Sequence, residues 1–92
     1  MTMREAVLDE AKLIVSKDRN TEYGEPEVNF ARIAELWSAY KQEDFQLHDV
    51  AVMMMLVKVA RIATSPYVQD HWIDIAGYSA CGAEVGKRAF SA

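Results

Sequence analysis

Hydrophobic residues along this chain recur at the three-to-four-residue spacing of amphipathic helices. Val7 and Ala11 lie on one face of a first predicted helix, at about residues 3–17. Thr2 followed by Glu5 is a capping-box pattern, which places the start of that helix at the N-terminus. After a turn-rich segment, the same spacing predicts a second helix.

The second predicted helix covers about residues 26–41. Pro26 suits its first turn, where the missing N–H costs nothing, and Phe30, Ile33 and Trp37 then share one face. No stretch of the chain alternates hydrophobic and polar residues long enough to predict a strand. The pattern therefore favours an all-α protein.

Two further helices, at about 47–63 and 68–86, form a predicted hairpin around the Thr64–Ser65–Pro66 turn. The first of them is hydrophobic nearly all round until Lys58, a pattern typical of a bundle centre or an interface. We therefore expect a single-domain, four-helix bundle-like fold, residues 1–92, with a central apolar helical hairpin.

Composition adds an expectation of self-association. Hydrophobic residues make up 51 % of the 92 residues, more than a lone domain of this size easily buries. One helix of four cannot be surrounded by its own neighbours on every side. We expect a homodimer or higher homo-oligomer, with contacts to another copy from some of four residues: Met53, Met54, Met55 and Leu56.

Charge and hydropathy exclude several function classes. A net charge of −4 argues against a general nucleic-acid binder, which would present a basic face. The longest hydrophobic run, Val50 to Val57, is too short to span a membrane, and the N-terminus lacks a signal-peptide profile. The single cysteine, Cys81, fits a reducing compartment. We expect a cytoplasmic protein that binds no membrane.

Between Asp49 and Tyr78, four charged residues interrupt the apolar hairpin: Lys58, Arg61, Asp70 and Asp74. If the hairpin is antiparallel and turns near residue 66, Lys58 lies level with Asp74, and Arg61 with Asp70. One interpretation is a salt-bridge ladder that fixes the hairpin register. Desolvating such charges is costly, and hydrophobic replacements are often as stable, so a polar ligand site is the second interpretation.

In the ligand-site interpretation, the carboxylates hold Mg²⁺ and the cations contact phosphate, the arginine in bidentate fashion. Two side chains of the loop before the second helix close over the ligand by charge and stacking. The predicted ligand- and phosphate-binding residues are Arg19, Tyr23, Lys58 and Arg61, and the predicted magnesium ligands are Asp70 and Asp74.

Other candidate residues are weaker. Glu22 and Glu25 form an E-x-x-E pair, but in a loop where helical spacing is not assured. His48 and His71 each lie beside an aspartate at a helix start, where solvent exposure or capping is favoured over metal ligation. Asp49 is expected to stabilise the start of its helix. No Gly-rich phosphate loop or Ser-His-Asp pattern is present.

The segments DRNTEYGEPEVNF, IAELWSAY, DVAVMMMLVKVARIA and DHWIDIAGYSACGAE resemble a family of small phage and prophage proteins of unknown function. Their shared pattern is D-R-x-x-x-Y-G, an Asn-Phe and a Trp, then K-x-x-R and D-x-x-x-D-x-x-x-Y. The resemblance implies these signature positions here: Asp18, Arg19, Tyr23, Gly24, Asn29, Trp37, Asp49, Lys58, Arg61, Asp70, Asp74, Gly77 and Tyr78.

More distantly, the chain is similar to all-α nucleoside-triphosphate pyrophosphohydrolases of the MazG type. That resemblance implies a Mg²⁺-bound nucleotide between helices and an oligomer. Those enzymes present four carboxylates as E-x-x-E and E-x-x-D, whereas this hairpin offers Asp70 and Asp74. Three functions stay open: Mg²⁺-dependent cleavage of an NTP or dNTP, non-catalytic sequestration of a nucleotide signal, and inhibition of a host defence protein.

Overall fold

The computed structural model describes residues 1–16 and 24–90, which form helices and connecting turns without a strand. The four helices are α1 (Met3–Ile14), α3 (Pro26–Lys41), α4 (Leu47–Thr64) and α5 (Gln69–Phe90). The predicted all-α, bundle-like single domain is confirmed. Within the described ranges, no helix combines the length and hydrophobicity that crossing a lipid bilayer requires.

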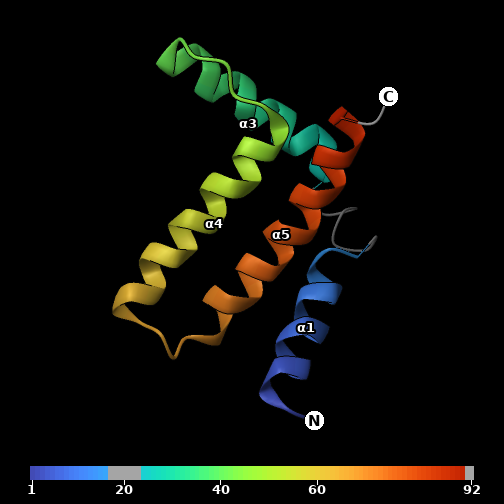
Figure 1. The fold of residues 1–92 in the computed structure, drawn as a ribbon, viewed down its shortest axis with the longest axis vertical. Helices are drawn as coiled ribbons and strands as arrows, with labels where there is room; N and C mark the ends of the chain where they lie inside the picture. Colours follow the sequence, from blue (N-terminus) through green and yellow to red (C-terminus); the bar gives the residue numbers. More distant parts are fainter. Residues whose placement is uncertain (17–23, 91–92) are drawn as a thin grey trace.

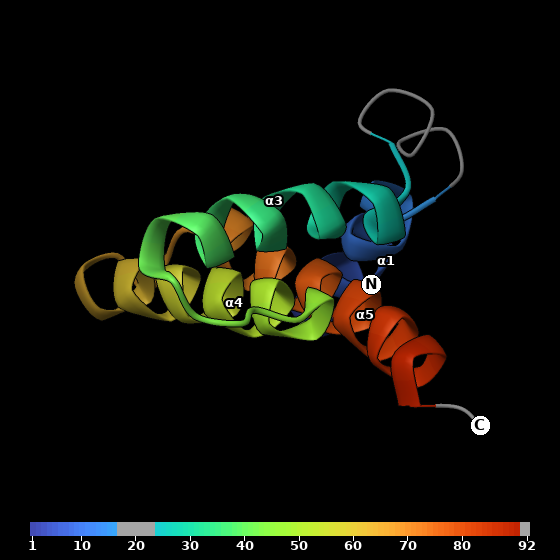
Figure 2. The same ribbon diagram turned by 90° about the horizontal axis from the view of Figure 1, so that it is seen from above.

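The α4–α5 hairpin is the centre of the architecture. Its two helices lie antiparallel and form one layer (Figure 1). Seen from above, α3 crosses one side of this layer and α1 lies along α5 on that same side (Figure 2). No described helix covers the opposite side of the hairpin. The predicted central apolar hairpin is therefore confirmed, and it is covered on one side within a single chain.

Side-chain caps fix the starts of α1 and α4. The Thr2 amide donates to Glu5 Oε1 at 2.9 Å and the Glu5 amide donates to Thr2 Oγ1 at 3.2 Å, so the predicted capping box is present. At α4, the Gln46 amide donates to Asp49 Oδ2 at 2.8 Å. The prediction that Asp49 stabilises its helix start is confirmed.

Two predicted helix ends were wrong. α1 ends at Ile14 instead of near residue 17, with Val15 as its C-cap. α5 continues to Phe90 instead of ending near residue 86. The extra turn of α5 is stabilised by Arg88, which forms ion pairs with Glu84 at 2.6 Å and with Glu27 of α3 at 3.4 Å.

The buried core lies where α3, α4 and α5 meet, and it consists of Phe30, Ala34, Val50, Ala51 and Val85. A Cβ atom added to Gly82 would lie 2.8 Å from the Ala51 Cβ, so α4 and α5 approach too closely there for any side chain. At Gly77 the neighbours are side chains of Ile14 and Val15. A Cβ atom at Gly77 would lie 3.8 Å from Val15, an ordinary contact, so the close approach that requires a glycine is the one between α4 and α5 at Gly82.

Candidate ligand-binding site

Lys58 and Asp74 join the two helices of the hairpin. The Lys58 Nζ atom lies 3.2 Å from Asp74 Oδ2, and the two side chains are only 20 % and 32 % exposed. This contact confirms the prediction that Lys58 and Asp74 lie opposite each other in the antiparallel hairpin. Partial burial strengthens the pair relative to a surface salt bridge, because water and salt screen it less.

The second predicted pair does not form. Arg61 and Asp70 are both exposed, and no ion pair joins them within the described part of the chain. Because each residue of an α-helix turns by about 100°, a side chain three residues along points about 60° away from the first one. Arg61 is therefore turned away from the line on which Lys58 meets α5. The ladder predicted from counting is a single salt bridge.

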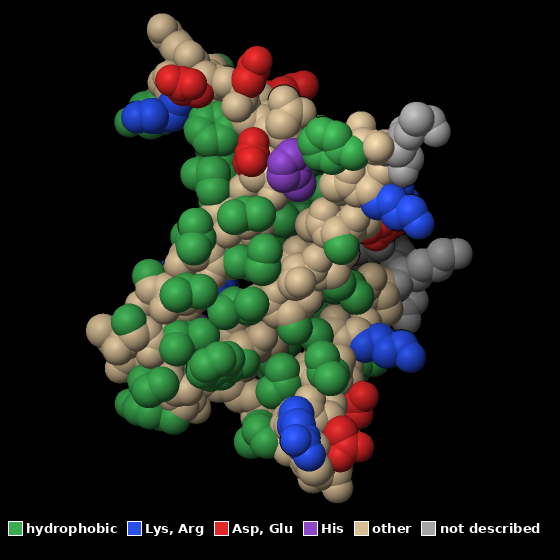
Figure 3. Space-filling model, viewed as in Figure 1, with side chains coloured by type: hydrophobic (Ala, Val, Ile, Leu, Met, Phe, Trp, Pro, Cys, Tyr) green, Lys and Arg blue, Asp and Glu red, His purple; other side chains and the backbone are tan. Residues whose placement is uncertain are grey.

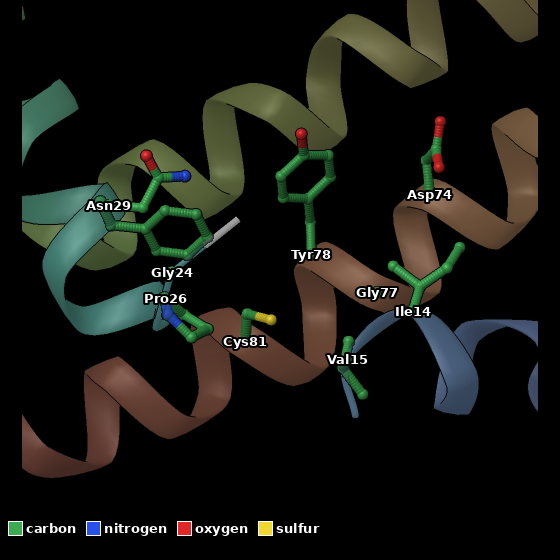
Figure 4. A pocket seen from close by; sticks show the side chains of 10 residues that line it. Ile14, Val15, Gly24, Pro26, Asn29, Asp74, Gly77, Tyr78 and Cys81 are labelled. Atoms are coloured by element: carbon green, nitrogen blue, oxygen red, sulfur yellow. The ribbon is translucent and has the colours of Figure 1, made fainter. Parts of the chain in front are cut away.

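Asp74 also lines a pocket of about 300 Å³ between the end of α1, the first turn of α3 and the middle of α5. Its lining residues are Ile14, Val15, Gly24, Pro26, Asn29, Phe30, Asp74, Gly77, Tyr78 and Cys81. In the close view, Asn29 of α3 and Tyr78 of α5 border the same space, with Asp74 further along α5 (Figure 4).

One face of α5 supplies much of the pocket wall. Asp74, Gly77, Tyr78 and Cys81 follow the i, i+3, i+4, i+7 spacing that places residues on one helical face. Gly77 leaves room for the end of α1, while Tyr78 stacks on Phe30 with ring centroids 6.4 Å apart and an interplanar angle of 29°. The wall is therefore largely aromatic and apolar.

Three polar groups distinguish this pocket from a packing defect. The Asn29 amide can both donate and accept hydrogen bonds, the Tyr78 hydroxyl can do the same, and the Asp74 carboxylate accepts them. Ligand pockets commonly combine an apolar wall with a few such groups. The arrangement suits a small molecule with an aromatic or apolar body and a polar edge.

Cys81 is a packing residue of the pocket wall. Burial raises the pKa of its thiol above the ordinary value, and the negative charge of Glu84 adds to the effect. A raised pKa keeps the thiol protonated and weakly nucleophilic at neutral pH. Cys81 is partly buried and packs against the core formed by α3, α4 and α5.

Several predicted residues cannot be placed in this site. Arg19, Tyr23 and Glu22 lie outside the described residues. Gly24 lines the pocket with φ at 86°, a left-handed conformation that favours glycine. Sequence reasoning did not select Asn29 or Tyr78 as ligand-binding residues, although both were signature positions of the resemblance.

A protein-family model described as a domain of unknown function, DUF6378, matches residues 6–86. The chain belongs to this family. It is similar to the gene 55 protein of Mycobacterium phage D29, with 40 % identity over 79 residues, covering 86 % of the chain and 52 % of the phage protein. With the gene 55 protein of Mycobacterium phage L5 it shares 45 % identity over 75 residues, covering 80 % and 48 %.

The chain thus spans about half the length of these curated phage relatives. No solved structure matches it significantly. Membership of DUF6378 and the phage relatives confirm the predicted relation to phage proteins of unknown function. The matched region contains every residue that lines the pocket, together with Lys58, so the site belongs to the part that defines the family.

The two predicted magnesium ligands lie one helical turn apart on α5. Within residues 1–16 and 24–90, no three His, Cys, Asp or Glu side chains converge as a metal site would require. Asp74 is also engaged by the Lys58 ammonium. Residues of this DUF6378 chain that the structure describes therefore do not form a dedicated all-protein magnesium cage, and Mg²⁺ binding stays a prediction.

The weaker histidine candidate at the start of α4 has a packing role. The His48 ring lies against Phe90 with centroids 5.4 Å apart, and its Nε2 atom is 3.7 Å from Asp49 Oδ1. Its Nδ1 atom is buried without a hydrogen-bond partner in the described structure. The His48–Phe90 contact joins the start of α4 to the end of α5 at the end of the hairpin opposite its turn, away from the pocket wall.

Proposed function

We propose that this chain binds a small phosphate-bearing ligand of the nucleotide class in the pocket between α1, α3 and α5. The observation that carries the proposal is that Asn29, Tyr78 and Asp74 line one pocket of about 300 Å³. These groups suit a planar aromatic ligand with hydrogen-bonding edges, which describes a nucleobase.

The aromatic wall supports the base-binding part of the proposal. Stacking of a base on a protein aromatic ring contributes about 1–3 kcal/mol, and it tolerates any base. The Asn29 amide would orient the bound base, because its N–H donor and its oxygen acceptor can form hydrogen bonds with the edge of a base. The cavity lies at the lower end of the usual size range of ligand pockets, about 300–1,000 Å³.

Cations of α4 support the phosphate-binding part. Lys58 contacts Asp74 at the pocket and keeps further ammonium donors beyond that one carboxylate. Arg61, one turn along α4, is exposed, and its guanidinium has no ion-pair partner among the described residues. A phosphate group at the pocket could be held by Lys58, and a ligand that extends along α4 beyond the pocket could also reach Arg61, whose guanidinium suits bidentate contact.

Binding is better supported than catalysis. A MazG-like, Mg²⁺-dependent pyrophosphohydrolase needs metal ligands, and Asp70 and Asp74 are two carboxylates without a third in the described part. A Mg²⁺ ion here would depend on the phosphate oxygens of the ligand, which is a common mode of Mg²⁺ binding. The alternative function is metal-independent sequestration of a nucleotide signal. Inhibition of a host defence protein stays a prediction without a supporting contact.

Thermal unfolding of the chain with a panel of nucleoside mono-, di- and triphosphates tests the proposal, with Mg²⁺ or with EDTA. We expect at least one nucleotide to raise Tm. Asn29→Ala should remove most of that rise, because Asn29 is exposed in the free protein and reaches the pocket. Glu35→Ala, an exposed position on the same helix outside the pocket, is the matched control and should keep it.

Product analysis of the same mixtures separates the two functions. Release of monophosphate and pyrophosphate that is lost in Asp74→Asn would establish hydrolysis, whereas recovery of intact nucleotide would establish sequestration. A panel in which no nucleotide changes Tm or binds by equilibrium dialysis would contradict the proposal.

A further inference from the structure

One face of the α4–α5 hairpin is exposed and hydrophobic. It lies on the side opposite α3, where no described helix covers it (Figures 1 and 2). Hydrophobic side chains gather over α4 and the adjoining part of α5 on this face, and the charged groups lie near its edges (Figure 3). A hydrophobic centre with a charged rim is the anatomy of a protein–protein interface.

The α4 half of this face carries large side chains. Val52, Leu56 and Val59 are exposed and follow one another at spacings of four and three, the repeat of a coiled-coil seam. Met53, also exposed, lies at the border of the stripe. A surface helix of a monomer normally presents charged residues there, so this stripe is unusual for a helix facing water.

The α5 half of the face carries small side chains. Ser79, Ala80 and Ala83 are exposed, and Trp72 closes the stripe near the turn of the hairpin. Small residues let another helix approach closely, as Gly82 already does for α4 within the chain. Large residues on one helix and small residues on its neighbour make the face complementary in shape to a copy of itself.

We propose that a second copy of this chain covers the hairpin face, with α4 of one copy packed against α5 of the other around a two-fold axis parallel to the hairpin. Two-fold symmetry makes the same patch serve both partners, which suits a face that is self-complementary in shape. The proposal is independent of the ligand pocket, which lies between α5 and the helices on the other side.

The area of the face is sufficient for a dimer. The exposed parts of its large side chains and of the small residues on α5 amount to roughly 600 Å² per copy, so two copies reach about 1,200 Å², the lower bound for stable interfaces. The absence of charge from its centre disfavours a charged partner such as a nucleic acid. It also accounts for the hydrophobic fraction of 51 % in so short a chain.

The hairpin register predicts which residues meet. Lys58 lies level with Asp74, and Ala51 lies level with Gly82. Rotation about an axis parallel to the helices keeps each residue at its own height. Residues near position 53 of one copy should therefore face residues near position 80 of the other.

Sedimentation equilibrium of the unmodified chain over a range of concentrations tests the dimer. We expect the mass of two copies, with dissociation only on dilution. Leu56→Glu should give the mass of one copy with helical circular dichroism retained, because Leu56 is 59 % exposed within the chain. Leu36→Glu, at a leucine that is 64 % exposed on α3, is the matched control and should remain dimeric. A single-copy mass for the unmodified chain, or a dimeric Leu56→Glu, would overturn the proposal.

Disulfide cross-linking tests the pairing without a destabilising substitution. Chains carrying Met53→Cys and chains carrying Ala80→Cys, each with Cys81→Ser and tags of different mass, are expressed together and oxidised. We expect mixed cross-linked dimers to exceed dimers of either variant with itself. A predominance of self-cross-linked dimers, or the absence of mixed ones, would overturn the proposed pairing of α4 with α5.

Discussion

The Lys58 ammonium lies 3.2 Å from Asp74 Oδ2, and the same carboxylate lines the pocket between α1, α3 and α5. One salt bridge therefore connects the packing of the hairpin with the chemistry of the candidate site. A change at either residue should act on stability and, if the pocket binds a ligand as proposed, on binding as well. Suitable pairs of substitutions can separate the two effects.

Removing one partner of this salt bridge should destabilise the fold. Lys58→Met leaves a partly buried Asp74 carboxylate unpaired, which should cost about 1–2 kcal/mol of unfolding free energy. Lys58→Met with Asp74→Leu should recover most of that loss, because hydrophobic replacements avoid desolvating charges. Urea unfolding of the single and double variants measures the coupling.

The same double variant tests whether the salt bridge has a role beyond structure. If the pocket binds a phosphate-bearing ligand, the variant should fold normally and lose the nucleotide-induced rise in Tm. Retention of that rise in the double variant would show that the pair is structural alone.

Two glycines on α5 should respond to alanine in opposite directions. A Cβ atom at Gly82 would lie 2.8 Å from the Ala51 Cβ, closer than two carbons can approach, so Gly82→Ala should destabilise the fold by about 1–3 kcal/mol. At Gly86 the nearest atom is the His48 Cβ at 3.8 Å, an ordinary contact.

Gly86→Ala should accordingly stabilise the fold by about 0.5–1 kcal/mol, through the helix propensity of alanine. Urea unfolding at one fixed protein concentration compares the two variants. Equal destabilisation by both substitutions would mean that the close approach of α4 and α5 is not confined to Gly82.

The Cys81 thiol should react slowly in the folded protein. Because burial raises its pKa above the ordinary value of 9.0, the thiolate fraction at pH 8 is smaller than in the unfolded chain. Alkylation by iodoacetamide should therefore be faster in urea than in buffer. Cys81 is the single cysteine, so mass spectrometry reports this reaction alone.

The raised pKa of Cys81 also predicts a direction for stability against pH. A group whose folded pKa is raised stabilises the fold below its unfolded pKa, and that contribution is lost as pH rises beyond it. Unfolding free energy should therefore fall as pH increases above about 9 in the native chain. Cys81→Ser should weaken this fall, since serine does not ionise there.

The capping box of α1 should make its first turn sensitive to acid. Hydrogen bonds from the Thr2 amide and hydroxyl lower the pKa of the Glu5 carboxyl. A lowered pKa means that the ionised carboxylate stabilises the helix start above the ordinary pKa, and that this is lost as pH falls through the lowered value. Amide protection factors in α1, which correct for the pH dependence of intrinsic exchange, should fall on acidification, and Thr2→Ala should show low protection factors already at neutral pH.

Local patterns explain why the helices were predictable. Hydrophobic spacing, the Thr2–Glu5 cap and the Thr64–Ser65–Pro66 turn act within a few residues, and the structure reproduces them. The end of α5 was mispredicted because it depends on a partner far away in sequence. Arg88 of the extended α5, for example, pairs with Glu27, 61 residues earlier.

The hairpin shows how far the antiparallel register alone can predict contacts between α4 and α5. An antiparallel turn fixes which residues are level, so the Lys58–Asp74 contact followed from the sequence. Whether a level residue also points at its partner depends on helix rotation and packing. In the structure, Lys58 points at Asp74, whereas Arg61 is exposed.

By itself, the sequence determined the helical class and the hairpin register, because periodicity and turn chemistry are properties of nearby residues. Only the tertiary structure decided that Asn29 and Tyr78 share a pocket with Asp74. Asn29 and Tyr78 lie on different helices and meet because α1 and α3 pack on the same side of the hairpin. Because α1 and α3 both pack on that side, the hydrophobic face of α4 and α5 on the other side is uncovered within the described part of one chain.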